Sequence, residues 1–233
     1  MAQLFSVNSR YVYMKQVLII VFAILLLGAC KKSDESVDFG YEYFGLTEGR
    51  FVSYDVMEIS HDGNSDTVKY ILKTVVGENI IDNEGRTAKK LYRYAYDSQT
   101  EELIDERVWT SIIDQGRGEV VEENQRKIRM VFAVTIDKIW DVNAFNPEEE
   151  QEVYYESIDE PYSINGFSLE STARVEYEDY VTLIDYDRKY EVYAKNIGLV
   201  HRSFKNLEIS NFDTTDIQNG WETHYTLRDY GVE

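Results

Sequence analysis

The sequence predicts a mainly β protein, a single domain whose antiparallel strands form one strongly curved sheet. Three observations lead to this fold class. Apolar and polar residues alternate over several long runs, which is the period of a half-buried strand. Turn-forming clusters rich in Gly, Asn and Asp separate those runs. Residues that favour sheets are plentiful, with 19 tyrosines among 233 residues. About ten strands are expected, and because that many rarely stay flat, the sheet should form a barrel of the lipocalin-like or lipoprotein-carrier kind, with a β-sandwich as the alternative.

The first segment, residues 1–29, is predicted to be a lipoprotein signal peptide. Lys15 precedes an unbroken apolar run, Val17 to Leu27. This run is about half the ~20 residues that a membrane-spanning helix needs. A positive end followed by a short apolar stretch is the layout of a signal peptide. Met14 begins a compact leader of this kind, so it is a candidate for the true translation start.

The leader ends in Leu27-Gly28-Ala29-Cys30, which resembles the lipobox of bacterial lipoproteins. The resemblance implies cleavage between Ala29 and Cys30 and attachment of acyl chains to Cys30. Two or three chains would anchor the protein stably, since each buried methylene contributes ~0.8 kcal/mol. Cys30 is also the only cysteine. Its acylation would therefore leave neither a disulfide nor a free thiol for catalysis.

Residues 30–40 are predicted to form a lipidated, flexible tether, because they are mostly polar and lack a hydrophobic period. Lys31 follows the cysteine where enteric bacteria place aspartate to retain lipoproteins in the inner membrane. That resemblance implies transfer to the outer membrane. Ser33-Asp34-Glu35 resembles the acidic signal that sends Bacteroidota lipoproteins to the cell surface, although a plain solvated linker explains it equally well. The expected location is therefore the outer membrane, on its periplasmic face or at the cell surface.

The net charge of the chain limits the classes of partner that it is expected to bind. Residues 1–29 hold two of the 24 basic side chains and none of the 43 acidic ones, which leaves a net charge of −21 on the mature chain. Phosphate backbones repel such a domain, so nucleic acid is not an expected partner. An anionic membrane surface repels it too, and attachment must come from the lipid anchor.

Residues 41–233 are predicted to form the single β domain. The run from Phe167 to Glu178 alternates apolar and polar side chains, as in a sheet with one solvated face. Ile128 and Met130 alternate in the same way with Lys127 and Arg129, which places the two cations on the predicted solvent face. Further strands are expected near residues 51–60, 67–76, 88–97, 106–114, 152–158, 198–210 and 221–229.

The connections between these strands are predicted from turn signals. The segment from His61 to Asp66 joins two strands as a hairpin, and Gln115 to Gly118 and Asn165-Gly166 are further turns. The acidic segment from Pro147 to Pro161 is expected to loop over one end of the sheet. Short helical turns are compatible with the pattern near residues 146–151 or 214–219.

Four stretches are similar to a recurrent pattern of uncharacterised Bacteroidota β-rich lipoproteins. Tyr43 to Gly49 resembles their "YFPL-x-x-G" element, with Gly45 where proline is usual. Trp140-Asp141 with Asn143 and Asn146 resembles their central tryptophan-to-asparagine stretch. Tyr193 to Val200 is similar to "YAKGIGLV", and the ending from Gly220 to Gly231 also fits. The resemblance implies kinship and supplies no catalytic residue.

No catalytic or cofactor motif is found, so the protein is expected to be a non-enzyme without a cofactor. The three histidines, His61, His201 and His224, lie in a turn and on predicted strands, where structural roles are the more common. Asp62-x-Asn64-x-Asp66 imitates the start of a calcium loop. The later positions of that loop require glycine and glutamate but hold Thr67 and Lys73, so a turn capped by side chains explains the segment better.

Three functions remain open at this point. The first is a membrane-anchored envelope lipoprotein that binds a lipid, a glycan or an envelope protein without catalysis. The second is a hydrolase acting on glycans through two carboxylates about 5–10 Å apart in one cleft. The third is a structural or assembly partner of an envelope complex. A cavity lined by apolar and aromatic side chains would favour the first.

Overall fold

The computed structural model describes residues 37–63 and 65–233. Every strand and the one short helical turn lie in a compact unit from Phe39 to Glu233. The predicted signal peptide, the lipidation site Cys30 and most of the tether lie outside the described residues. In the part of the chain described, no helix combines the length and the apolar character needed to cross a membrane.

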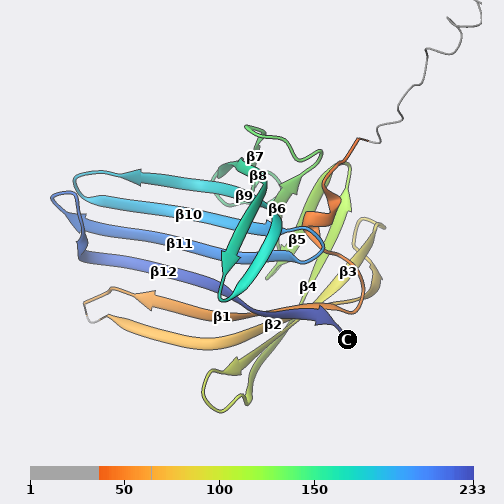
Figure 1. Ribbon diagram of the computed structural model, residues 1–233, viewed down its shortest axis with the longest axis horizontal. Helices are drawn as coiled ribbons and strands as arrows, with labels where there is room; N and C mark the ends of the chain where they lie inside the picture. The colour runs from red at the N-terminus through yellow and green to blue at the C-terminus, as the bar shows by residue number, and fades with distance from the viewer. Residues whose placement is uncertain (1–36, 64) are drawn as a thin grey trace, which may run out of the picture. The chain divides into compact units, whose positions relative to one another are not determined.

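Twelve antiparallel strands form one continuous, nearly closed sheet (Figure 1). Their order across the sheet is β6-β5-β4-β3-β2-β1-β12-β11-β10-β9-β8-β7. The predicted curved sheet or barrel is thus confirmed. The strands are β1 (Arg50–Ser60), β2 (Asp66–Ile81), β3 (Thr87–Asp97), β4 (Leu103–Asp114), β5 (Arg117–Glu122), β6 (Gln125–Val131), β7 (Ile139–Asp141), β8 (Glu152–Ile164), β9 (Phe167–Val181), β10 (Asp185–Ala194), β11 (Gly198–Ser210) and β12 (Asp213–Val232).

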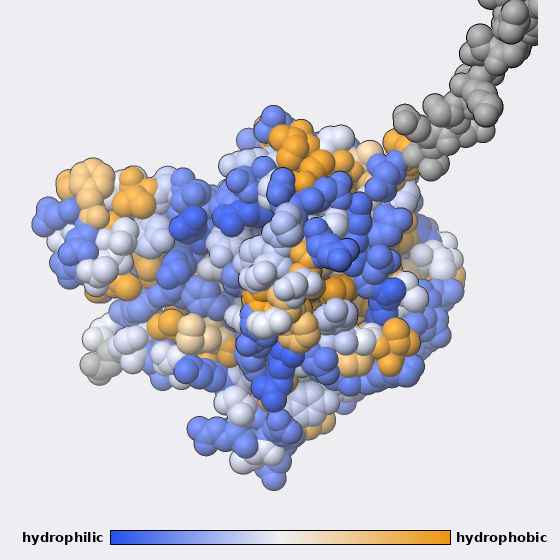
Figure 2. All heavy atoms as spheres, viewed as in Figure 1, coloured by the Kyte–Doolittle hydropathy of each residue, from blue (hydrophilic) through white to orange (hydrophobic). Residues whose placement is uncertain are grey.

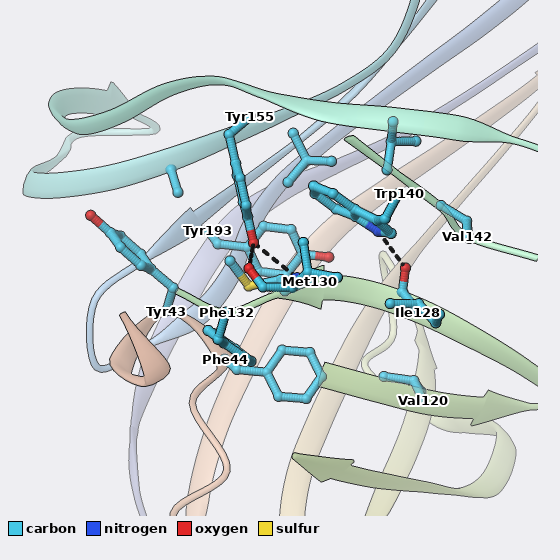
Figure 3. Packing of buried hydrophobic residues seen from close by; sticks show 14 of the residues in the cluster. Tyr43, Phe44, Val120, Ile128, Met130, Phe132, Trp140, Val142, Tyr155 and Tyr193 are labelled. Carbon is cyan, nitrogen blue, oxygen red and sulfur yellow. Dashed lines mark hydrogen bonds between the residues drawn. The ribbon is translucent and has the colours of Figure 1, made fainter. Parts of the chain in front are cut away.

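The two edges of the sheet, β6 and β7, are joined by hydrogen bonds that close the barrel at one side. The backbone N–H of Ile128 donates to the carbonyl of Val142 at 2.9 Å. The indole N–H of Trp140 donates to the carbonyl of Ile128 at 3.0 Å, as Figure 3 shows. The hydroxyl of Tyr155 accepts from the backbone N–H of Val131 and donates to its carbonyl. These bonds satisfy edge groups that would otherwise lie buried and unpaired.

A short 3-10 helix, η1 (Tyr41–Phe44), packs into the core next to the closure. The hydroxyl of Tyr43 donates to Asp159 at 2.8 Å and bonds to Ser171, which fixes the turn against β8 and β9. Gly45 follows with φ of 59°, a conformation that proline cannot adopt because its ring holds φ near −65°. The glycine at the usual proline position is therefore required by the local backbone.

The predicted sheet of about ten strands has twelve in the structure, and β5, β7 and β10 are the additional ones. Several predicted connections are wrong. Residues 214–219 belong to β12, whereas residues 146–148 form a bend and residues 149–151 are irregular, so neither segment is helical. The expected loop from Pro147 to Pro161 is largely strand β8. Pro161 is tolerated there because it lies at an irregularity of the β8–β9 register, between Glu160 and Tyr162, and β7 pairs only with the start of β8.

The ends of two adjacent hairpins carry a group of exposed apolar side chains. Leu183 and Ile184 lie in the β9–β10 turn, and Phe212 lies in the β11–β12 turn; each is more than half exposed. Backbone hydrogen bonds join the two turns, from Phe212 N to Leu183 O and from Ile209 N to Ile184 O. Figure 2 shows apolar atoms at this left-hand end of the molecule.

Candidate ligand-binding cavity

The barrel contains a half-open cavity of about 120 Å³ whose wall combines apolar side chains with arginines. This is similar in size to the ~150 Å³ engineered cavity known to bind benzene. Apolar side chains from η1 and from strands around the barrel make up most of the wall. They are Phe44, Leu46, Val52, Val76, Leu91, Val120, Ile197 and Leu199.

Four arginines line the same cavity, each from a different strand. Arg50 comes from β1, Arg93 from β3, Arg129 from β6 and Arg202 from β11. Arg129 was predicted to lie on the solvent face, and that prediction is wrong, because the side chain is 7% exposed. Inward positions in a small barrel are usually apolar, so four guanidinium groups there need a specific explanation.

Two of these arginines are neutralised by a buried network. The guanidinium of Arg129 donates to Glu122, with Nη2 2.6 Å from Oε1, and to the hydroxyl of Tyr177 at 3.1 Å. Arg202 pairs with the fully buried carboxylate of Glu191, with Nε 2.7 Å from Oε1. The hydroxyls of Tyr177 and Tyr193 also donate to Glu191, at 2.9 and 2.6 Å.

The network keeps both of its carboxylates ionised. Burial alone would raise the pKa of Glu191, but Arg202 and Arg129 outweigh it and lower the pKa to about 2. Burial also opposes ionisation of Glu122, and Arg129 with Arg202 lowers the pKa of that carboxyl below its ordinary value. Glu122 and Glu191 therefore each supply one negative charge to the barrel interior near neutral pH.

The other two arginines are left without a carboxylate. Neither Arg50 nor Arg93 forms an ion pair within residues 37–63 and 65–233. The Nε of Arg50 is buried without a hydrogen-bond partner, and so is the hydroxyl of Thr74, which lines the same cavity. Arg93 stacks on the ring of Trp109, with its guanidinium carbon 3.7 Å from the ring centroid. Two positive charges of the cavity thus have no carboxylate in direct contact among the described residues.

The wall of this cavity is held in place by two of the stretches noted in the sequence. Gly45 and Leu46, which follow η1, lie on it together with the β10–β11 turn at Ile197. The backbone N–H of Asn196 donates to the carbonyl of Glu42 at 2.8 Å, which ties that turn to η1. The stretches Tyr43–Gly49 and Tyr193–Val200 therefore meet at the cavity.

A second cavity, of about 420 Å³, adjoins the first. Arg93, Trp109 and Tyr225 line both, so these three side chains form the partition between them. The remaining lining is largely apolar and comes from β1 to β4. It consists of Val68, Tyr70, Leu72, Ala95 and Ile104, with Glu58, Asp105 and Arg107.

The three histidines lie away from these cavities. The Nε2 atoms of His61 and His224 contact the two oxygens of Glu222 at 3.1 and 3.0 Å, and Nδ1 of His201 bonds to the hydroxyl of Tyr162. Burial lowers the pKa of His201 to about 4. In the described part of the chain, no cluster of His, Cys, Asp and Glu side chains is arranged to hold a metal ion.

Sequence reasoning missed the four cavity arginines, because no local motif marks them. Each comes from a different strand, and only the closing of the barrel brings the four together. The predicted lipidation site Cys30 and its cleavage position after Ala29 lie outside the described residues. The central position of the calcium-like loop, Asn64, does so as well.

Comparison with known proteins finds similarity to two solved structures. No protein-family model matches the chain, and no curated protein matches it significantly. Among solved structures, it is similar to a protein of Bacteroides fragilis described as exported and as having a YmcC-like fold. The identity is 13% over 80% of this chain and 98% of that one, with a TM-score of 0.43. A protein of Parabacteroides distasonis described as a lipoprotein is 12% identical over 84% of this chain and all of its own, with a TM-score of 0.42.

Proposed function

We propose that the protein is a lipid-anchored envelope protein that binds a small organic anion inside its barrel without catalysing a reaction. The observation that carries the proposal is the excess of positive charge on the cavity wall, where neither Arg50 nor Arg93 forms an ion pair with the described residues. Both side chains are half-buried, and an anionic ligand with a carboxylate or phosphate group would pair with them.

The charge of the cavity wall is the reverse of the protein's own. The whole chain carries a net charge of −19, yet the cavity wall has an excess of positive charge, with four arginines and one glutamate. Solubility does not explain these arginines, since it depends on charges at the surface. Bidentate guanidinium groups match carboxylates and phosphates in geometry, which favours these two ligand classes.

The cavity favours binding over the glycan hydrolase considered above. Its one lining carboxylate, Glu122, is held by Arg129 and has a lowered pKa. A general acid for glycoside hydrolysis needs a raised pKa and a second carboxylate in the same cleft.

The binding proposal is tested by titration calorimetry with butyrate and butyl phosphate, using butanol as the uncharged comparison. We expect at least one anion to bind and butanol to bind at least tenfold more weakly. Arg50→Gln and Arg93→Gln should each weaken anion binding about tenfold or more, because a hydrogen bond to a charged group contributes about 1.5–3 kcal/mol. Arg228→Gln is the matched control, since Arg228 is exposed and pairs with Asp55 outside the cavity. Equal binding of butanol and the anions would refute the proposal.

The anchor is tested separately by mass spectrometry of membrane-extracted protein. The proposal expects a mature N-terminus at Cys30 that carries acyl chains, and a Cys30→Ala variant that is neither cleaved there nor acylated. A wild-type protein that is unmodified and freely extracted in buffer would refute the anchor.

A further inference from the structure

We propose that the bound anion is a single-chain amphiphile, whose charged group lies between Arg50 and Arg93 and whose apolar tail lies in the second cavity. This inference rests on the proposed anion site and adds the class of ligand. The two cavities differ in volume. The first cavity, of about 120 Å³, has room for a headgroup, whereas the adjoining cavity of about 420 Å³ lies in the range of ordinary small-molecule pockets.

The charges divide the two cavities into a headgroup end and a tail end. Arg50, Arg129 and Arg202 line the first cavity and not the second. The second cavity has two carboxylates on its wall, Glu58 and Asp105, which balance Arg93 and Arg107, and Asp105 pairs with Arg107 at 2.7 Å. Its wall therefore lacks the excess of positive charge found in the first cavity. An anionic group is therefore expected in the first cavity, and an uncharged part of the ligand in the second.

The wall of the second cavity has apolar side chains that the fold leaves exposed. Val68 is 51% exposed and Ile104 is 60% exposed, although both line this cavity. Together with Leu72 and Ala95 they make up an apolar part of its wall on β2, β3 and β4. Covering such a surface by an alkyl chain is favourable by ~0.8 kcal/mol for each buried methylene.

The partition between the cavities suits a ligand that crosses it. Arg93 belongs to both linings, and its guanidinium is stacked on Trp109 rather than held by a carboxylate. It can therefore bind the charged group from the first cavity while the chain passes the rings of Trp109 and Tyr225. Trp109 itself is fixed by its indole N–H, which donates to Glu123 at 3.1 Å.

The first test is an affinity series of butyrate, octanoate and dodecanoate, with dodecyl phosphate to distinguish the carboxylate from the phosphate headgroup. We expect affinity to rise by about fourfold for each added methylene until the second cavity is full, which is the fold-change equivalent to ~0.8 kcal/mol. Dodecanol should bind at least tenfold more weakly than the preferred anion of the same length. A flat series in which butyrate still binds would overturn the tail placement and leave the anion site standing, whereas no binding of any anion would overturn both.

A blocking variant locates the tail. Ala95→Trp fills the second cavity without removing an arginine, so it should keep butyrate binding and abolish the gain with chain length. Tyr96→Trp is the matched control, because neighbouring residues of a strand point to opposite faces. An unchanged chain-length series in a folded Ala95→Trp protein would overturn the placement.

A fluorescence measurement on the wild-type protein tests the position of the tail without the Ala95→Trp variant. Dodecanoate brominated at its far end should quench tryptophan fluorescence, since Trp109 lines the proposed path. The quenching should disappear in Trp109→Phe, which leaves Trp140 and Trp221 in place. Quenching that persists in Trp109→Phe would overturn the proposed path of the tail.

Discussion

The buried network around Glu191 gives the sharpest prediction about stability. Glu191→Gln keeps the shape of the side chain but removes the negative charge that faces Arg202 and Arg129. The pKa of this carboxyl falls from 4.5 to about 2 on folding. That difference corresponds to about 3 kcal/mol of stability near neutral pH. Breaking one partner of a buried ion pair typically costs a similar ~3–5 kcal/mol.

The loss of stability in Glu191→Gln should depend on pH in a defined direction. A carboxyl whose pKa is lowered by folding stabilises the protein fully above the unfolded value of 4.5 and loses this effect as the pH falls through about 2. The gap between the wild type and Glu191→Gln should therefore be widest above pH 4.5 and shrink steadily below it.

Urea unfolding followed by circular dichroism measures both effects. The control is Glu48→Gln, because Glu48 is exposed and pairs with Lys89 at the surface, where a bridge contributes about 1 kcal/mol or less. A Glu191→Gln protein that is no less stable than Glu48→Gln at pH 7 would refute the reasoning that these charges are desolvated.

Two further substitutions test the barrel closure and the exposed hairpin ends. Tyr155→Phe should lower the free energy of unfolding by about 1–3 kcal/mol, because it leaves the backbone N–H and carbonyl of Val131 without their partner. Urea titration measures this change, and an unchanged midpoint would contradict the role of Tyr155 in closing the barrel. Phe212→Gly should raise the free energy of unfolding by about 1 kcal/mol, because Phe212 has φ of 62° in a turn where glycine is unstrained. A destabilised variant would show that contacts of the Phe212 ring contribute more stability than the strained backbone removes.

Strands in which apolar and polar residues alternate could be predicted from the sequence, whereas strands with charged residues at buried positions or with few apolar residues could not. Strand β9 was expected from Phe167 onward because its apolar face is unmistakable. Strand β10 was missed because Asp187 and Glu191 on it are charged yet buried, which disguises the period. The first part of β12 was missed for a related reason: residues 213–219 are almost all polar, and pairing with β11 rather than local preference makes them extended.

The candidate site could not be predicted because its chemistry depends on distant pairing. Arg129 alternates with Ile128 and Met130 as a solvent-facing residue would, and all three are buried. The alternation rule assumes one wet face, whereas β6 has the barrel interior on one side and the closing strand with its loop on the other. The partners of Arg129 show the separation in sequence, since Tyr177 is 48 residues away.

The cavity arginines allow binding and folding to be separated by one substitution. Arg50 has a buried Nε without a partner, and an unsatisfied buried polar group costs about 1–3 kcal/mol. If the residue serves a ligand, it is kept at the expense of stability in the empty protein. Arg50→Met fills the same space without the charge, so its free energy of unfolding in urea should exceed that of the ligand-free wild type by about 1 kcal/mol. The variant should also lose the stabilisation that the preferred anion confers on the wild type. An Arg50→Met protein that is clearly less stable than the wild type would instead show that Arg50 supports the fold, and the argument for an anion between Arg50 and Arg93 would lose its main support.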